Sequence, residues 1–462
     1  MMDTERNLKA TGLTRRDFLR GVVGVGVASA LAACAPKEPA APVADEPVEA
    51  PAAAELTKIS YWTFWADRWG EFQGTIVEGF NESQSDIEVE MLIVPWGELD
   101  TKLLTAIPAG NPPDFTIVGR SGVIDFAVRG GIMDLNDRVA GDASVKADDW
   151  FDVAWTECQW EGKTYGLPFE TGTYAYWLNK DIFEEVGLDP DSPPVTWDDV
   201  DAAMEKITVG DATAGYDRLG VIPWQPRVDI LGWLAGGKWY DEESKKITAV
   251  TEPNIAAFSW IKQYADTYGG EAIQRFAEGL GGSDTEDDSF LRGKLGMVNK
   301  GSWSLSAKYE YAPDLNIDVF ATPYRTGATN RTIGQGSGCV LPKGSPSPDA
   351  AFEFLVWMSI SGVAEWVPFA ADMVSRKDQM DIYPDALPDN DEGRKFWATY
   401  NDALAYAYHE PLMPVRAFWG SELNAARDSV ILGGMGAEEA LQIAQDNTQR
   451  ELDNALENVE EL

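Results

Sequence analysis

The sequence contains 18 tryptophans, as many as it has phenylalanines. A hydrophobic core needs no such excess, because every buried indole N–H must find a hydrogen-bond partner. An indole ring on a loop can instead stack on the apolar C–H face of a sugar ring. Seven tryptophans lie at the ends of predicted strands or beside Gly and Pro, where loops would present them: Trp62, Trp65, Trp96, Trp224, Trp233, Trp303 and Trp419. For each of them alone, packing in the core is an equally good interpretation.

Five further tryptophans lie within helical or strand-like patterns and are expected in the core: Trp155, Trp160, Trp260, Trp357 and Trp397. The rim of hydroxyls on a sugar needs polar partners, and carboxylate, phenol and guanidinium groups can supply them. The candidates are Asp67, Asp114, Glu170, Tyr174 and Arg376.

Several of these polar residues have a structural alternative. Asp114 follows Pro112-Pro113 and opens a strand, so it can equally cap a turn. Arg376 can form one more surface salt bridge in so acidic a chain. Tyr174 and Tyr176 flank Ala175, and we expect one of them to face a cleft and the other to face the core.

Enzymatic and metal sites find little support in the residue types. With one histidine, His409, and three cysteines, any site needing two histidines and any zinc site built from four cysteines are excluded. A catalytic triad would have to use His409, and no G-x-S-x-G motif accompanies it. The acidic run 282–288 lacks the spacing of an EF-hand and is interpreted as a solvated turn before a helix from Ser289. No cofactor and no metal are predicted.

Two alternatives stay open at this point. A secreted glycoside hydrolase would also be rich in tryptophan, and a carboxylate pair flanking its scissile bond cannot be excluded among so many acidic residues. Cys158 and Cys339 could pair outside the cytoplasm, although two buried free thiols are the expected state.

The net charge of −39 restricts the partners. A surface this acidic repels phosphate backbones and anionic lipid headgroups, so binding of nucleic acid or docking through a basic patch is not expected.

The N-terminus has the features of an export signal. Arg15-Arg16 form a twin-arginine pair, and a short apolar run follows at 21–33. The run ends in Leu31-Ala32-Ala33-Cys34, which resembles a lipobox with Cys34 as the lipidated residue. The run has about 13 residues, fewer than the ~20 of a spanning helix. Residues 1–33 are therefore predicted to be a lipoprotein signal, and 34–56, rich in Ala and Pro, a tether.

The next segments alternate between strand and helix patterns. Strands are predicted at 59–65, 87–94 and 114–118, with helical faces between them, which is typical of parallel βαβ units with helices on both sheet faces. Ligands of such sheets gather at the carboxyl ends of the strands. Residues 162–179 are extended and aromatic and could cross between two domains. Helices are predicted at 180–186, after the N-cap Thr196, at 252–268, at 290–305, and after Ala350 and Glu438.

Several segments, in register, resemble the extracellular solute-binding proteins of ATP-driven importers, the sugar-binding group that includes maltose-binding protein. The segments are Tyr176–Phe183, Gly187–Pro190, Pro194–Trp197, Phe290–Trp303, Gly334–Ser345 and Pro414–Arg427. Trp177-Leu178 stands where the family usually has Tyr before Asn-Lys, and Gly296 stands where the family prefers Ala.

The resemblance implies an α/β fold of two lobes, each a sheet flanked by helices, joined by crossing hinge strands. The expected divisions are 57–168 for the first part of the N-terminal lobe, 169–345 for the C-terminal lobe with its return crossing, and 346–462 for helices shared between lobes. It also implies that Trp303 and Trp419 lie in the cleft. The expected function is capture of a sugar by a lipid-anchored monomer at the outer face of the cytoplasmic membrane and delivery to an ABC permease.

Overall fold

The computed structural model describes residues 56–225 and 227–460, apart from the side chains of Trp96 and of residues 458–460. The predicted signal at 1–33, with Cys34, lies outside the described residues, as does the tether except for its last residue, Leu56.

The first sheet begins with the predicted βαβ units. Strand β1 (Thr57–Thr63) buries alternate residues, and helix α1 (Asp67–Ser83) places Ile76 and Phe80 on one buried face. Strand β2 (Ile87–Ile93), helix α2 (Trp96–Ala106) and strand β3 (Phe115–Gly119) follow. Both β2 and β3 pair with β1 in parallel, as the sequence predicts.

The other half of this sheet is antiparallel. Strand β15 (Gln335–Val340) pairs with β3 and with β6 (Leu167–Gly172), and β16 (Met373–Val374) pairs with β6. The order is β16-β6-β15-β3-β1-β2, so the prediction of parallel units holds for the first three strands only. The added strands come from segments that return from far along the chain, which local periodicity does not reveal.

The second sheet has β7 (Tyr174–Asn179) at its centre, with β12 (Met297–Gly301) and β13 (Ile317–Phe320) paired antiparallel on its two sides. The helix predicted at 290–305 is wrong: turns at 289–293 lead into β12, and helix α11 (Ser304–Tyr311) begins only afterwards. Gly293 has a φ of 69°, which ends any helix there, and Met297 and Asn299 alternate as buried strand residues.

Tyr174 and Tyr176 lie on the same face of β7, because side chains two apart in a strand point the same way. The ring of Tyr174 contacts Trp303, and that of Tyr176 contacts Phe320. Both rings are buried and lie on one face of the strand, so the expected division, with one ring towards a cleft and the other towards the core, is not found.

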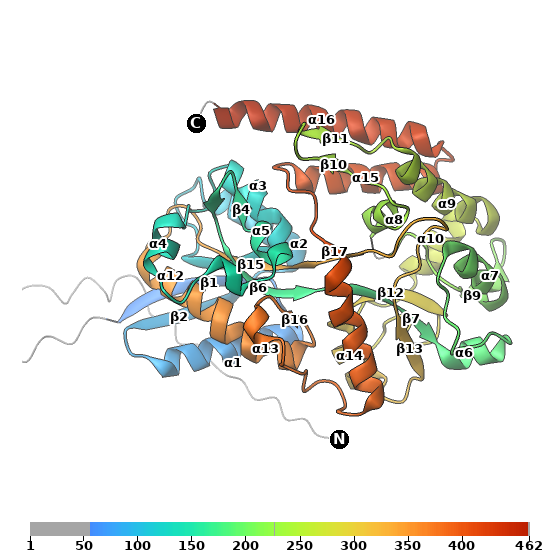
Figure 1. Ribbon diagram of the computed structural model, residues 1–462, viewed down its shortest axis with the longest axis horizontal. Coiled ribbons are helices and arrows are strands. Elements are labelled where there is room, and N and C mark those ends of the chain that lie inside the picture. The colour runs from blue at the N-terminus through green and yellow to red at the C-terminus, as the bar shows by residue number, and fades with distance from the viewer. Residues whose placement is uncertain (1–55, 226, 461–462) are drawn as a thin grey trace, which may run out of the picture. The chain divides into compact units, whose positions relative to one another are not determined.

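The remaining helices surround the two sheets (Figure 1). They are α3 (Val123–Val128), α4 (Asn136–Gly141), α5 (Asp152–Thr156), α6 (Lys180–Glu185), α7 (Trp197–Ile207), α8 (Val228–Leu234), α9 (Glu252–Tyr268), α10 (Gly270–Glu278), α12 (Pro348–Trp357), α13 (Val363–Ala370), α14 (Asp391–Ala403), α15 (Arg416–Ile431) and α16 (Ala437–Glu460). Short strands complete the chain: β4 (Gln159–Trp160), β5 (Lys163–Thr164), β8 (Val209–Asp211), β9 (Gly215–Arg218), β10 (Tyr240–Asp241), β11 (Lys246–Ile247), β14 (Thr332–Ile333) and β17 (Ala407–Tyr408).

Helix α7 begins at the predicted cap. Thr196 accepts a hydrogen bond from the backbone N–H of Asp199, whose carboxylate accepts from the N–H of Thr196, which completes a capping box. The next long helix, α9, has the bounds that its apolar spacing predicts.

Two separate hydrophobic cores define two lobes. One core lies around the six-stranded sheet and includes residues of α1, α12 and α13. The other lies around the three-stranded sheet and includes residues of α7, α9 and α14 to α16. Within the described residues one helical run, Pro348–Ala370, is long and apolar enough to cross a membrane, and half of it is buried in the first core.

The lobes are joined by strands that pass between the sheets. Strand β6 of the first sheet continues through Thr173 into β7 of the second, and β14 leads back into β15. Strand β17 pairs in parallel with β14, so a third segment runs along this crossing. Two α/β lobes connected by crossing strands are the predicted fold.

The crossing strands approach each other closely at Gly336. A Cβ atom there would overlap the carbonyl oxygen of Glu170 and the guanidinium group of Arg120. Gly79, in the interior of α1, has no atom within 4 Å of the corresponding position.

Gly336→Ala should therefore lower the free energy of unfolding by about 1–3 kcal/mol, the usual effect of overpacking. Gly79→Ala, the matched control, should raise it by roughly 0.5–1 kcal/mol, because alanine favours a helix. Urea unfolding of both variants measures the difference. Equal effects would show that the crossing strands can separate at Gly336 without cost.

Candidate functional site

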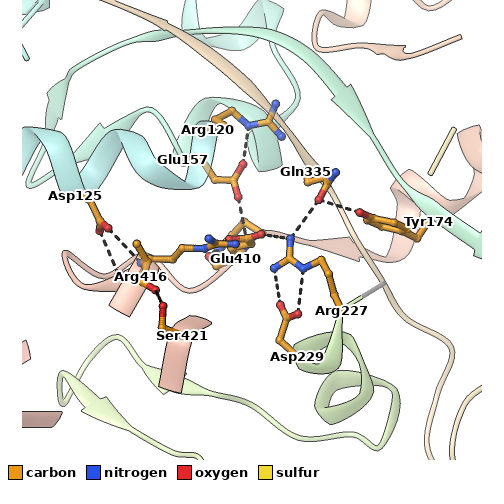
Figure 2. Close-up of polar contacts among 12 residues, drawn as sticks. Arg120, Asp125, Glu157, Tyr174, Arg227, Asp229, Gln335, Glu410, Arg416 and Ser421 are labelled. Atoms are coloured by element: carbon orange, nitrogen blue, oxygen red, sulfur yellow. Dashed lines mark hydrogen bonds and ion pairs between the residues drawn. The ribbon is translucent and has the colours of Figure 1, made fainter. Parts of the chain in front are cut away.

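A chain of ion pairs runs between the lobes beside the crossing strands (Figure 2). Arg120 follows the carboxyl end of β3, and its side chain is fully buried. Its Nε donates to Glu157 at 2.6 Å, Nη1 donates to the carbonyl of Glu170 at 2.7 Å, and Nη2 donates to Thr171 at 3.2 Å. One guanidinium group therefore holds the crossing strand β6 to the first lobe.

The series of ion pairs continues at Glu410, which follows β17. Its backbone N–H donates to Glu157 at 3.2 Å, and its buried carboxylate pairs with both Arg227 and Arg416. Arg227 in turn forms two hydrogen bonds to Asp229, of 3.0 and 2.6 Å. The pairs thus connect the first lobe to the start of α8 in the second.

The same guanidinium group reaches the crossing strands. Arg227 Nη1 donates to Gln335 Oε1 at 3.2 Å, and the hydroxyl of Tyr174 donates to the same oxygen at 3.3 Å. Figure 2 shows these side chains converging from β7, β15 and the segment before α8. Gln335 of the first sheet is therefore linked to Arg227 and Tyr174 of the second lobe.

Burial and pairing set the ionisation of these groups. Burial alone would raise the pKa of Glu410, but the guanidinium groups of Arg227 and Arg416 outweigh it and lower the pKa to about 2. Burial also raises the pKa of Glu157, and the charge of Arg120 only partly opposes this. Glu410 is thus a permanent anion between two cations.

Helix α15 is held to the first lobe at its N-terminus. The backbone N–H groups of Arg416 and Ala417 donate to the carboxylate of Asp125 on α3, both at 3.2 Å. Burial raises the pKa of Asp125 to about 7, although these donors favour the anion. A carboxylate at a helix N-terminus also interacts favourably with the helix dipole.

Aromatic rings gather on the opposite flank of β6. In the first lobe, Trp65 lies 4.7 Å from Trp366 and 5.6 Å from Phe169, measured between ring centroids. In the second lobe, Trp303 meets Tyr174 edge-on at 5.5 Å. A Cβ at Gly172 would lie 2.9 Å from the Trp303 ring, so the indole rests directly on the crossing strand.

Two of the predicted polar contacts have structural roles. The buried carboxylate of Asp114 accepts from the backbone N–H groups of Ser60 and Ser347, both at 2.8 Å, which joins the middle of β1 to the start of α12. Arg376 is buried, pairs with Asp378 and lies over the ring of Trp150 at 4.8 Å. Asp114 thus has the structural role that the sequence also allowed, and Arg376 forms the salt bridge that the sequence also allowed, but as a buried residue rather than at the surface.

Glu170 lies in the crossing strand as predicted. Its carboxylate accepts from the backbone N–H of Ser337 at 2.7 Å and from the Ser337 hydroxyl at 2.9 Å. Burial raises the pKa of Glu170, and Arg120 opposes that shift. The carboxylate lies at the junction of the two lobes, as its sequence position suggests.

Three of the predicted loop tryptophans are buried instead: Trp224, Trp233 and Trp419 lie in the second core. Trp233 packs on Tyr408 at 4.1 Å, and Trp419, 1% exposed, packs on Trp239 at 6.0 Å. At these three positions, neighbouring Gly and Pro residues therefore did not predict an exposed side chain. Of the five expected core tryptophans, Trp260 and Trp397 are buried, and Trp155, Trp160 and Trp357 are half-buried.

The other candidates are partly accessible. Trp62 and Trp65 are half-buried against the first core, and Asp67 is exposed at the start of α1 with a φ of 50°. Trp96 begins α2, but its side chain lies outside the described residues. The half-buried rings of the first lobe thus lie at the carboxyl end of β1, where a sheet of this type binds ligands, and Trp303 in the second lobe is also half-buried.

The acidic run 282–288 is held by a buried lysine. Lys300 donates to Ser283 at 2.8 Å and pairs with Asp284 and Asp288, of which Asp288 is buried. The run is a turn with five of its seven residues exposed, as expected, and only Asp284 and Asp288 are drawn inward by Lys300. The helix expected from Ser289 is wrong, because 289–293 form turns. Across the described ranges, 56–225 and 227–460, no group of three His, Cys, Asp or Glu side chains is arranged to hold a metal ion.

Cys158 and Cys339 are both free and buried, as predicted. Burial raises the pKa of Cys158 to about 12, so this thiol stays protonated.

Two hollows occur in the second lobe. One, of about 10 Å³, is lined by Arg227, Tyr176 and Asn299 and has room for one water molecule. The other, of about 340 Å³, is a groove between α7 and α9. Between the lobes, the backbone N–H of Glu410 donates to Glu157 and that of Arg416 donates to Asp125, so the lobes are in direct contact at these points.

The family model described as bacterial extracellular solute-binding protein matches residues 18–365. The chain belongs to this family. An arabinooligosaccharide-binding protein of Bacillus subtilis is 23% identical over 311 residues, which cover 65% of this chain and 69% of that protein. An sn-glycerol-3-phosphate-binding periplasmic protein of Yersinia pestis is 25% identical over 343 residues, covering 68% and 73%. Among solved structures, CpMnBP1 with mannotriose bound has a TM-score of 0.77 at 23% identity, covering 85% of this chain and all of that one.

Sequence reasoning missed the main polar groups of this solute-binding protein. Arg120 had a usable signal, because it directly follows β3, at the end of the sheet where ligands gather. No sequence pattern marks Glu410 or Arg227 as a site residue, since both lie in irregular segments and are brought together only by the crossing strands.

Glu410→Gln should lower the free energy of unfolding by about 3 kcal/mol at pH 7, because it leaves two partly buried guanidinium groups without their shared anion. The pKa of Glu410 is lowered in the folded state, so its contribution is fully present above pH 4.5. The difference between variant and wild type should therefore shrink as the pH falls towards 2. Chemical denaturation at a series of pH values measures this.

Glu252→Gln is the matched control, because Glu252 also pairs with an arginine, Arg325, but in the open at the surface. It should leave the free energy of unfolding nearly unchanged. If the free energy of unfolding falls by the same amount in both variants, the network between the lobes stabilises the protein no more than a surface ion pair does.

Proposed function

We propose that this solute-binding protein captures a sugar or oligosaccharide between its two lobes and delivers it to an ABC importer. Family membership supports the transport role, and the names of the relatives include binding proteins for arabinooligosaccharide and maltotriose. The observation that carries the proposal is the placement of Trp65 and Trp303 on opposite lobes, beside the same crossing strand.

The proposed contacts follow from this placement. Trp303 and Trp65 would stack on the apolar faces of sugar rings, with Tyr174 beside Trp303. The carboxylate of Glu170 retains lone pairs beyond its two bonds to Ser337, so it would accept from a sugar hydroxyl. Trp62, Asp67 and Trp96 would form the edge of the site at the carboxyl end of β1 and the start of α2.

Capture is proposed to depend on closure. A sugar would favour the closed arrangement only to the extent that it binds that arrangement more tightly than the open one. The permease would then recognise the closed form. No bond in the sugar would be broken, and the protein is proposed to act as a monomer without catalytic activity.

Attachment to the membrane is proposed to be through lipid alone. Arg15-Arg16 would direct export, and Cys34 would receive the lipid, which leaves 35–56 as a tether outside the cytoplasm.

A panel of sugars tests the proposed ligand class. Mannotriose, maltotriose or arabinotriose should raise the melting temperature of the protein, and about 2.7 kcal/mol of stabilisation is expected at a hundredfold excess over Kd. A rise with sn-glycerol 3-phosphate and with none of the sugars would reject the carbohydrate assignment. Release of shorter sugars from the trisaccharides would support a hydrolase instead.

Trp303→Ala should weaken binding of the best sugar by about 10- to 200-fold, as expected for loss of a stacking ring worth ~1.5–3 kcal/mol. The matched control is Trp357→Ala, because Trp357 is also half-buried but packs on Phe80 and Phe354 in the first core. Isothermal titration calorimetry should show unchanged affinity for the control. Equal affinity for both variants would remove Trp303 from the site.

Cys34→Ser should release the protein from membranes into the soluble fraction of the producing cells, because one serine removes the only acceptor for lipid in the predicted lipobox. Cys158→Ser, which changes a buried thiol, should stay with the membrane fraction. Immunoblots of the membrane and soluble fractions measure where each variant is found. A Cys34→Ser variant that stays in the membrane fraction would contradict lipid attachment.

A further inference from the structure

Arg68 connects the two lobes on the flank of β6 where the aromatic rings gather. It lies in the first turn of α1, in the first lobe, and its guanidinium group reaches α11 of the second. Nη2 donates to the hydroxyl of Ser306 at 2.8 Å, and Nη1 pairs with the carboxylate of Glu310. Ser306 and Glu310 follow Arg68 by 238 and 242 residues and belong to the other lobe. Separation of the lobes must therefore break both contacts.

The contact continues to Trp303. The hydroxyl of Ser306 donates to the backbone carbonyl of Trp303 at 2.8 Å. Trp303 is the N-cap of α11, so this bond supports the first turn of the helix, from which the indole extends. Arg68, Ser306 and Trp303 thus form one chain of hydrogen bonds from the first lobe to the proposed sugar-stacking ring.

The guanidinium group lies among aromatic rings. Its central carbon is 4.1 Å from the ring centroid of Trp69, 5.5 Å from that of Phe369 and 5.9 Å from that of Tyr311. Trp69 in turn lies 5.7 Å from Trp366. A cation between aromatic rings is partly desolvated, so its pairing is worth more than that of an exposed ion pair.

We infer that Arg68 is a positioning residue of the binding site, which couples closure of the lobes to the orientation of Trp303. The inference rests on the proposed function, because it assumes that Trp303 stacks on the ligand. Arg68 itself need not touch the sugar. Its contacts with Ser306 and Glu310 require the lobes to be together, so they add stability to the closed form and hold the first turn of α11, which carries Trp303, to the first lobe in that form.

Calorimetric titration with mannotriose, maltotriose and arabinotriose tests this on the full-length protein. Arg68→Ala should weaken the binding of whichever sugar binds the wild type by about tenfold, mainly through faster dissociation. The charge-exchanged double variant Arg68→Glu/Glu310→Arg should recover part of that loss. The matched control is Arg325→Ala, because Arg325 pairs with Glu252 in two hydrogen bonds within the second lobe. That variant should bind like the wild type.

Two results would overturn the inference while leaving the proposed function intact. One is wild-type affinity in Arg68→Ala, and the other is an equal loss in Arg325→Ala. A wild type that binds none of the three sugars would count against the proposed function instead.

If the wild type binds none of the three sugars, a measurement without ligand tests whether Arg68 holds the lobes together. Spin labels at Glu78 and Glu184, both exposed and on different lobes, report the distance between α1 and α6. Arg68→Ala should shift the distribution towards longer distances. Identical distributions in wild type and variant would overturn the coupling.

Discussion

The crossing between the lobes depends on one buried anion, Glu410, held between Arg227 and Arg416. Isolated buried charges are very costly, so each member of this network must keep its partner. Through Arg227 the anion is tied to β15 and to α8, and through its N–H it is tied to Glu157 in the first lobe. Because the network includes groups from both lobes and from the strands between them, it sets where those strands can bend.

The two connections between the lobes differ in their surroundings. The Glu410 network lies beside the strands that join the lobes covalently. The contacts of Arg68 join α1 and α11, which have no covalent link near that point, so they form and break with closure. A receptor that closes on its solute needs both kinds of contact, one that maintains the hinge and one that marks the closed form.

Local patterns predicted a large part of the fold. The apolar spacing of 252–268 gives the bounds of α9, and the Thr196 cap marks the start of α7. The antiparallel half of the first sheet was not predictable, because β15 and β16 join β3 and β6 from far along the chain. The helix expected at 290–305 failed because Gly293 interrupts it and pairing with β7 makes Met297–Gly301 a strand.

The candidate site was predicted less well, for a physical reason. Residue type and neighbouring Gly or Pro suggest that a ring is near a loop, but burial depends on packing from distant segments. Trp419 illustrates this, since it is buried against Trp239, which precedes it by 180 positions. Glu170 and Tyr174, by contrast, lie in the crossing strands, as the extended and aromatic pattern of 162–179 predicts.

The central claim is that a sugar closes two lobes around itself. Small-angle X-ray scattering of the full-length protein, with and without a saturating sugar from the trisaccharide panel, tests it most directly. The radius of gyration should fall when the sugar is added, and Trp303→Ala at the same sugar concentration should show a smaller fall. Binding of a sugar with no change in the scattering profile would show that the lobes do not close on it.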